Sequence, residues 1–492
     1  MLKLSSGIFL LALAGVYLLF GCGAVTNTTP TPAGNFSVVV FSDLHFNPFY
    51  DPTLFQQLLA ADPSQWASIF QTSKVKTVSA WGSDTNYPLL ELALSSIKQN
   101  LGASPVVIYT GDLIGHSFPT DFYCLYMPPH TLPCSPSEVP TAQDIAAMQA
   151  FTDKTVAFVT AQVRASVGNL PVMFAVGNID SYTGYGPDST FLANNAGTFY
   201  SQFANGTVDQ QTFLNTFTSG GYYSAQPLGS KLTVIGLNTN PFALGVPGDN
   251  DGAVAAELSW LDSTLASAQA AHQKVWLLMH VPPGANTVTT AASIDSNGQI
   301  ASATMMMYQS YQTSLLQLLS KYPGLITMTL GAHTHMDEYR ILSPSVVLDE
   351  VPAISPCFGE NPAFKVFTVT GNTFTPTDYT SLNYDLAVMP AQAQFNNYYT
   401  FSAAYALQGP LGASLIQLYP ELATNMALTN THPPNAQQLH YMGQYNSGNY
   451  YWNLNGNPPA YWNAITNANW PVFACGIGKM AQLDFEDCVN SY

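Results

Sequence analysis

The sequence is 492 residues long and 47% hydrophobic, which excludes a wholly disordered chain. Only 8% of the residues are charged, far below the ~25% usual for soluble domains, so uncharged polar residues must cover much of the surface, as in many extracytoplasmic proteins. The formal net charge is −17 with only 12 Lys and Arg, so the chain lacks the basic surface that nucleic-acid binding requires and should repel long polyanions.

The N-terminal residues have the pattern of an export signal. The apolar run 7–20 is too short to span a membrane, and it ends in Leu-Phe-Gly-Cys at 19–22, which resembles a bacterial lipobox. That motif would make Cys22 a lipidated mature N-terminus; an ordinary signal peptide that contains a cysteine is the alternative. We therefore predict a signal peptide over 1–21, a linker over 22–35, and a protein that is secreted or attached to a membrane through its lipid anchor only.

Strands and helices alternate along most of the chain. Short β-branched and apolar runs predict buried strands, and longer segments with apolar residues three and four apart predict helices. The predicted strands are 36–42, 105–109, 172–176, 232–237, 275–279 and 325–330, and the predicted helices are 89–101, 142–167, 253–271 and 308–322. This order favours an α/β fold with sheets buried by helices, in a main domain of residues 36–378. Beyond about Tyr379 the strand pattern fades, so residues 379–492 are expected to form a helical, loop-rich extension packed on that domain.

Cysteines stand in two close pairs after Cys22. Cys124 and Cys134 form one pair, and Cys475 and Cys488 form the other. In an oxidising compartment each pair could close a short loop by a disulfide, although two pairs of free thiols are the alternative. Cys357 is then left over and expected to be buried.

Potential metal ligands stand at or beside the ends of five predicted strands. They are Asp43, His45, Asp112, Asn178, His280, His333 and His335. Functional sites of open α/β sheets form at the carboxyl ends of strands. Residues two apart in an extended segment point the same way, so each Asp-x-His or His-x-His pair can face one site. Imidazole and carboxylate ligands suit zinc, iron or manganese, and a bridging carboxylate, for which Asp112 is the natural choice, holds two ions about 3.5–4 Å apart.

The order of these residues resembles the signature of the calcineurin-like metallophosphoesterases. The matching blocks are Asp43-Leu-His45, Gly111-Asp112, Gly177-Asn178, His280 and Gly331-Ala-His333-Thr-His335. The resemblance implies a four-layer α/β/β/α sandwich and two divalent transition-metal ions, with zinc as the first choice and iron or manganese as alternatives. It assigns to one ion Asp43, His45, Asp112 and His335, and to the other Asp112, Asn178, His280 and His333.

Three further segments resemble the acid sphingomyelinase-like phosphodiesterases. They are Gly111–His116, His333–Glu338 and Ile354–Phe364. In that branch the histidine matching His116 acts near the leaving group, and a cysteine-bearing C-terminal region packs on the catalytic domain. The resemblance implies a small phosphate ester as substrate, such as a lipid headgroup or a nucleotide.

One position departs from the family pattern. The usual Gly-Asn-His block reads Gly177-Asn178-Ile179 here, and isoleucine can neither donate a proton nor titrate. Either His116 carries the acid role alone, or activity is reduced, because general acid catalysis contributes about 10²–10⁴-fold.

The sequence therefore leaves three functions open. The first is a phosphodiesterase acting outside the cytoplasm, and the second is a phosphomonoesterase or polyphosphatase on the same metal core. The third is a metal-binding surface lipoprotein with reduced activity, for which Ile179 is the support. No feature of the sequence predicts the oligomeric state. Of two weaker signals, Asp84 either reaches the pocket or acts as a helix cap or turn residue, and His130 is expected in a surface loop.

Overall fold

The computed structural model describes residues 34–136, 138–246, 250–388, 394–429, 431–448 and 465–492. The predicted signal peptide, Cys22 and nearly all of the predicted linker lie outside these residues. Within the described ranges, no helix is both long enough and apolar enough to cross a membrane.

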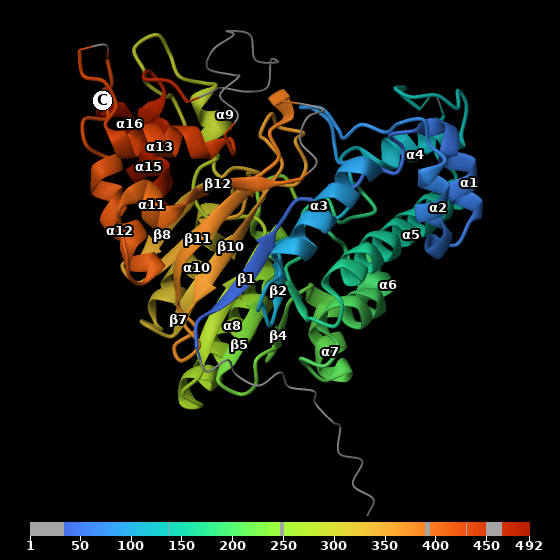
Figure 1. Cartoon of the computed structure of the whole chain (residues 1–492), viewed down its shortest axis with the longest axis horizontal. Coiled ribbons are helices and arrows are strands. Elements are labelled where there is room, and N and C mark those ends of the chain that lie inside the picture. Colours follow the sequence, from blue (N-terminus) through green and yellow to red (C-terminus); the bar gives the residue numbers. More distant parts are fainter. Residues whose placement is uncertain (1–33, 137, 247–249, 389–393, 430, 449–464) are drawn as a thin grey trace, which may run out of the picture.

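Two six-stranded mixed sheets form the centre of the fold (Figure 1). The first has the order β12-β11-β10-β1-β2-β3 and the second the order β4-β5-β6-β7-β9-β8. The strands of the first sheet are β1 (Phe36–Phe41), β2 (Val107–Tyr109), β3 (Val172–Phe174), β10 (Ala363–Val369), β11 (Pro376–Asn383) and β12 (Asn396–Thr400). Those of the second are β4 (Tyr223–Ala225), β5 (Leu232–Gly236), β6 (Lys274–Leu278), β7 (Ile326–Gly331), β8 (Tyr339–Ser343) and β9 (Val346–Glu350).

The two sheets pack face to face, and helices cover their outer faces. Because successive strand residues point to opposite faces, Trp276 and Leu278 of β6 belong to the core that contains the first sheet, whereas Leu277 belongs to a second core with α8 (Asp251–Ala270) and α10 (Gln309–Ser320). On the other side, α3 (Tyr87–Asn100) and α5 (Ala142–Val167) bury their apolar faces in the core of the first sheet (Figure 1). The predicted α/β fold in four layers is therefore confirmed.

Shorter helices surround these layers. On the side of β1 to β3 lie α1 (Phe55–Ala60), α2 (Trp66–Gln71), α4 (Phe118–Tyr126), α6 (Ser189–Phe199) and α7 (Gln210–Gly220). Towards the opposite edge lie α9 (Thr287–Ala291), α11 (Phe401–Tyr405), α12 (Leu411–Leu422), α13 (Ala436–Tyr445), α15 (Trp470–Gly478) and α16 (Gln482–Asn490). Among these, α12 contacts β9 and β11, and α15 contacts β8 and α9.

Several strands were not predicted. The predicted boundary between residues 378 and 379 falls inside β11, and β12 extends the first sheet beyond it. The segment of β12, Asn-Asn-Tyr-Tyr-Thr, has no alternation of apolar and polar residues because this edge strand has no fully buried face. Part of β11 and all of β12 thus lie within the predicted extension, whose other described elements are mainly the helices α11, α12, α13, α15 and α16.

Both predicted cysteine pairs form disulfides. Cys124–Cys134 ties α4 to the loop after it, and Cys475–Cys488 ties α15 to α16. The remaining cysteine of the described residues, Cys357, is only half-buried and lines the cavity described below, so the expectation that it is buried is wrong.

Candidate dimetal site

All seven predicted metal ligands follow parallel strands at the carboxyl end of the sheets. Asp43 and His45 follow β1, Asp112 follows β2, Asn178 follows β3, His280 follows β6, and His333 and His335 follow β7. The first three of these strands belong to one sheet and the last two to the other. The site thus lies where the two packed sheets end side by side, and neither sheet forms it alone.

The backbone at five of these residues is left-handed rather than extended. The φ angles are 47° at Asp43, 39° at His45, 64° at Asp112, 75° at His333 and 68° at His335. Positive φ is uncommon for residues other than glycine and costs on the order of 1–3 kcal/mol each, and such residues cluster at functional sites. The paired side chains converge as predicted, but the reason expected, an extended segment with residues two apart on one side, is wrong.

Two glycines allow the strand ends to approach one another. A Cβ atom on Gly177 would lie 1.9 Å from Oδ1 of Asp112, and one on Gly111 would lie 2.6 Å from Nδ1 of His280. Neither position can carry a larger side chain without displacing a candidate ligand. The glycine in each Gly-Asp or Gly-Asn block therefore leaves the space that a neighbouring candidate ligand occupies.

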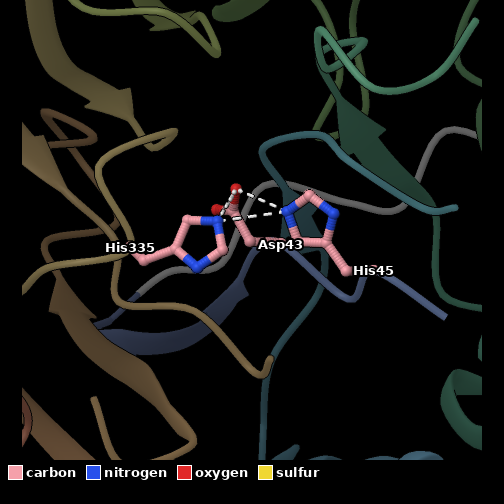
Figure 2. Close-up of side chains that lie close together, drawn as sticks. All are labelled: Asp43, His45 and His335. Carbon is pink, nitrogen blue, oxygen red and sulfur yellow. Dashed lines mark hydrogen bonds and ion pairs between the residues drawn. The ribbon is translucent and has the colours of Figure 1, made fainter. Parts of the chain in front are cut away.

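One group of ligands converges on Asp43 (Figure 2). The Nε2 atoms of His45 and His335 lie 3.1 Å apart, and Oδ1 of Asp43 lies 3.6 Å from the first and 3.3 Å from the second. The Nδ1 atom of each imidazole has a different partner. Nδ1 of His335 lies 2.8 Å from Oε1 of Glu360, and Nδ1 of His45 lies 3.2 Å from the carbonyl oxygen of Ile114. Both carboxylate oxygens of Asp43 are buried without a hydrogen-bond partner among the described residues. A cation bound by these atoms would satisfy them.

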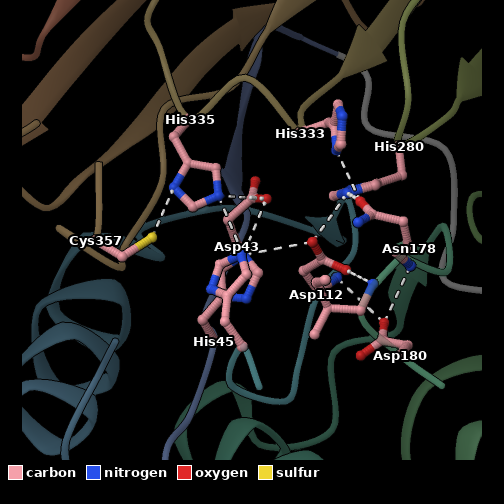
Figure 3. A network of polar contacts seen from close by, with 12 residues as sticks. Asp43, His45, Asp112, Asn178, Asp180, His280, His333, His335 and Cys357 are labelled. Atoms are coloured by element: carbon pink, nitrogen blue, oxygen red, sulfur yellow. Dashed lines mark hydrogen bonds and ion pairs between the residues drawn. The ribbon is translucent and has the colours of Figure 1, made fainter. Parts of the chain in front are cut away.

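Asp112 joins this group to a second one (Figure 3). Its Oδ2 atom lies 3.4 Å from Nε2 of His45 and 3.1 Å from Nε2 of His280. On the far side, Oδ1 of Asn178 lies 2.9 Å from Nε2 of His280 and 2.7 Å from Nδ1 of His333. The carboxylate predicted to bridge two ions therefore lies between the two groups of ligands.

Burial has the largest effect on the pKa values of these groups. It lowers the pKa of His335 to about 4 and that of His333 to about 3, because a charged imidazole loses its hydration inside the protein. Burial alone would raise the pKa of Asp43, but His335 and His45 outweigh it and hold that pKa below its usual value. Neutral imidazoles and ionised carboxylates are the forms that bind metal ions, so the shifts of His333, His335 and Asp43 fit a metal site. At His280 burial is outweighed by the charge of Asp112, which raises the pKa of that imidazole to about 9.

Ile179 contributes to the site through its backbone. Its N–H donates a 2.7 Å hydrogen bond to Oδ1 of Asp112, while its side chain is 6% exposed and belongs to the hydrophobic core. The next residue, Asp180, accepts backbone N–H bonds from Leu113 at 2.7 Å and Gly177 at 3.0 Å, which ties the loop after β2 to the loop after β3. The backbone bond to Asp112 and the contacts of Asp180 are therefore present although the histidine of the family motif is absent.

Sequence reasoning missed the residues that orient the ligands. Glu360 holds His335, and the carbonyl of Thr110 lies 2.8 Å from Nδ1 of His280. Glu360 lies in a loop before β10 and carries no signal of periodicity, so no local pattern could have singled it out.

A cavity of about 1060 Å³ opens above the candidate ligands. Its lining includes one candidate ligand, His333, together with Asp84, His116, Cys357 and Phe358. The His116 ring stacks on that of His45, with centroids 4.0 Å apart, and its Nδ1 lies 2.8 Å from Oδ1 of Asp84.

The two weaker sequence signals are resolved by their positions. Asp84 reaches the pocket, and the cap of α3 is Asn86 instead. His130 is exposed, contacts the carbonyl of Leu125 at 3.0 Å, and does not line this cavity.

The donor set fits two neighbouring divalent cations. It consists of imidazole nitrogens, carboxylate oxygens and one amide oxygen, which suit transition metals better than calcium. Within the described residues, Asp43 forms one compact group with His45 and His335 and another with Asp112 and His280. The shared carboxylates place the two groups side by side, as a dimetal site requires.

No protein-family model matches the chain. It is 26% identical over 400 residues to sphingomyelin phosphodiesterase B of Dictyostelium discoideum, an alignment that covers 76% of this chain and 54% of that protein. It is also 26% identical over 405 residues to the cyclic GMP-AMP phosphodiesterase SMPDL3A of Rattus norvegicus, covering 78% of this chain and 80% of that protein. A dimetal phosphatase from Danio rerio aligns with a TM-score of 0.39 and 10% identity, over 70% of this chain and 95% of that one.

The chain thus spans about half the length of the first relative, 54%, and most of the second, 80%. Both relatives are named as phosphodiesterases. The chain is therefore related to the sphingomyelin phosphodiesterases and to SMPDL3A, and its resemblance to the acid sphingomyelinase-like branch of the calcineurin-like metallophosphoesterases is confirmed.

Proposed function

We propose that this protein is a dimetal-dependent phosphoester hydrolase whose substrate is a small phosphodiester. The observation that carries the proposal is the position of Asp112 between two groups of imidazole and carboxylate ligands, beneath a cavity of about 1060 Å³. The names of the relatives, sphingomyelin phosphodiesterase and cyclic GMP-AMP phosphodiesterase, support the diester class.

Two divalent ions would share the bridging residue. Asp43, His45, Asp112 and His335 would hold one ion, and Asp112, Asn178, His280 and His333 the other. Zinc is our first choice, with iron or manganese as alternatives, since the ligands are imidazoles and carboxylates. Such a pair supplies Lewis acidity, which makes water a stronger nucleophile and stabilises negative charge on the phosphate.

The protein's own proton donor would be His116. This residue lines the cavity above the ligands, and its side chain is 31% exposed, so a substrate can reach it. Ile179 cannot take part, because an aliphatic side chain neither donates nor accepts a proton. We therefore assign to His116 alone the transfer of a proton to the leaving oxygen.

The charge of the cavity favours a diester over a polyanion. Asp84 and Asp121 line it together with the aromatic residues Tyr50, Trp81 and Phe358, and none of the described residues in the lining is Lys or Arg. A diester carries a single negative charge, which the metal ions can neutralise, whereas polyphosphate would bring many charges to an acidic protein. A phosphomonoesterase or polyphosphatase is accordingly the second candidate.

We also propose that the protein works outside the cytoplasm. Its two disulfides, Cys124–Cys134 and Cys475–Cys488, are typical of an oxidising compartment. The lipobox-like sequence ending at Cys22 favours a lipid anchor at a bacterial membrane, with secretion as the alternative.

The test is metal analysis combined with a substrate panel. Purified protein should contain about two transition-metal ions per chain and hydrolyse bis(p-nitrophenyl) phosphate faster than p-nitrophenyl phosphate or polyphosphate. Chelation should abolish hydrolysis, and added zinc or manganese should restore it. Activity that survives complete removal of metal would overturn the proposal. A fully loaded protein that hydrolyses none of the three substrates would favour the metal-binding surface lipoprotein instead.

A further inference from the structure

We infer that Asp84 is a positioning residue, which holds the imidazole of His116 so that its Nε2 atom faces the cavity above the metal ligands. The kinetic consequence of this inference rests on the proposed function, whereas the orientation of the ring does not. The loop that carries Asp84 showed no catalytic pattern in the sequence.

Asp84 contacts His116 at two points. Oδ1 lies 2.8 Å from Nδ1 of the ring, and Oδ2 accepts a 2.6 Å hydrogen bond from the backbone N–H of the same residue. A single contact would leave the ring free to turn about its side-chain torsions, whereas a carboxylate that binds both the ring and the backbone restricts them. The Asp84 side chain is only 8% exposed, so little water competes for these bonds.

The carboxylate is itself anchored to the segment that carries a metal ligand. The N–H of Thr85 donates to the carbonyl of His45 at 3.1 Å, and the N–H of Asn47 donates to the carbonyl of Thr85 at 2.9 Å. On the other side, the N–H of Gly82 donates to the carbonyl of Pro356 at 3.0 Å. These backbone bonds fix the segment of Asp84 relative to the metal ligands. Asp84 therefore holds His116 in a defined position relative to the same ligands.

Close packing leaves the ring one orientation. A Cβ atom on Gly115 would lie 3.0 Å from Oδ2 of Asp84, so the glycine before His116 leaves room for the carboxylate. The ring also stacks on His45, with an interplanar angle of 19°. With Nδ1 bound to Asp84, Nε2 is the ring nitrogen that remains for a substrate in the cavity.

This arrangement matters because Ile179 removes the second proton donor of the family pattern. A reaction that depends on one imidazole depends on the direction in which that imidazole points, as the aspartate of serine-protease triads illustrates. Loss of Asp84 should therefore impair those substrates whose leaving group must be protonated, and should spare those whose leaving group departs as an anion.

The experiment compares two diesters in the metal-loaded protein. One is bis(p-nitrophenyl) phosphate, with a good leaving group, and the other is a dialkyl phosphate diester such as diethyl phosphate, with a poor one. For Asp84→Asn we expect kcat/KM to fall about 10²–10⁴-fold on the alkyl ester, the range of general acid catalysis, and less than about tenfold on the nitrophenyl ester. Asp262→Asn, at a surface ion pair with Lys321, serves as the control and should leave both rates unchanged.

The ratio of the two rates separates positioning from general damage. Partial unfolding of Asp84→Asn would lower both rates equally and leave their ratio as in the native protein. An unchanged ratio therefore overturns the inference. His116→Ala should change the ratio as much as Asp84→Asn does, and the double variant should be no worse than His116→Ala, because both substitutions remove the same function.

A second measurement does not need activity. In zinc-loaded protein with ¹⁵N-labelled histidine, we expect Nδ1 of His116 to be protonated and hydrogen-bonded to Asp84, and Asp84→Ala to remove that hydrogen-bond signature. Identical His116 signals in the native protein and in Asp84→Ala would overturn the inference even if the protein hydrolyses neither diester. Native protein that hydrolyses neither diester but shows the expected change in signal would overturn the proposed function and leave the positioning role supported.

Discussion

The backbone N–H of Ile179 donates a 2.7 Å hydrogen bond to Oδ1 of Asp112, the carboxylate between the two groups of candidate ligands. This bond does not depend on the side chain at position 179. The isoleucine therefore keeps the contact that orients the bridging carboxylate and lacks only the proton donor of the family pattern. Metal binding and proton transfer are separable at this position.

Replacing Ile179 with histidine tests how much the missing donor matters. If His116 suffices, Ile179→His should change kcat/KM on an alkyl diester by less than about tenfold and should leave the metal content unchanged, since the backbone bond to Asp112 remains. Steady-state kinetics and elemental analysis check this. A rise of about 10² or more would show that the native site lacks an effective acid.

Asp112→Asn should remove both metal binding and turnover. Its Oδ2 lies near both His45 and His280, so an amide there loses the negative charge that two ions would share. Lewis-acid stabilisation of several kcal/mol corresponds to a loss of about 10³-fold in kcat/KM. The matched control is Asp209→Asn at the exposed cap of α7, where asparagine caps equally well. Full activity with two ions per chain in Asp112→Asn would contradict the assignment.

Glu360→Gln should weaken metal binding without removing a ligand. Oε1 of Glu360 lies 2.8 Å from Nδ1 of His335, and partners of this kind typically change metal affinity by about 10–100-fold. Competition with a chromophoric chelator measures the affinity. Glu421→Gln, an exposed residue of α12, is the control and should match the native protein. Equal affinities in the two variants would show that Glu360 does not support the site.

Lys365→Met should destabilise the whole fold. The Nζ atom of this buried residue of β10 lies 2.6 Å from Oδ1 of Asp349 in β9 and 2.7 Å from Oδ1 of Asp337, so it links the two sheets. Its loss leaves two buried carboxylates without their cation, which should lower the free energy of unfolding by about 3–5 kcal/mol.

Urea unfolding at equal zinc concentration measures this change. Lys321→Met, which removes the exposed ion pair with Asp262, should cost only about 0–1 kcal/mol. A loss for Lys365→Met no larger than that of the control would mean that the buried cluster adds little to stability.

The sequence by itself determined the order of strands and helices that carry the site. Buried strands such as 36–42 and the helix 142–167 have strong periodicity, and the ligands after them follow because strand ends meet at one edge of a sheet. The same reasoning found both disulfide pairs, because short loops bring the cysteines of each pair together. These features depend on local pattern and on spacing along the chain.

Only the tertiary structure decided how the ligands converge and what supports them. The backbone at Asp43 and His335 is left-handed; Asp and His adopt this region more often than most residues, but no local pattern in the sequence specifies it at these positions. Glu360 and Asp84 lie in loops distant in sequence from the histidines that they contact, and such long-range contacts leave no periodic pattern in the sequence. Local pattern thus specified the residue types at the site, whereas long-range packing specified their orientation.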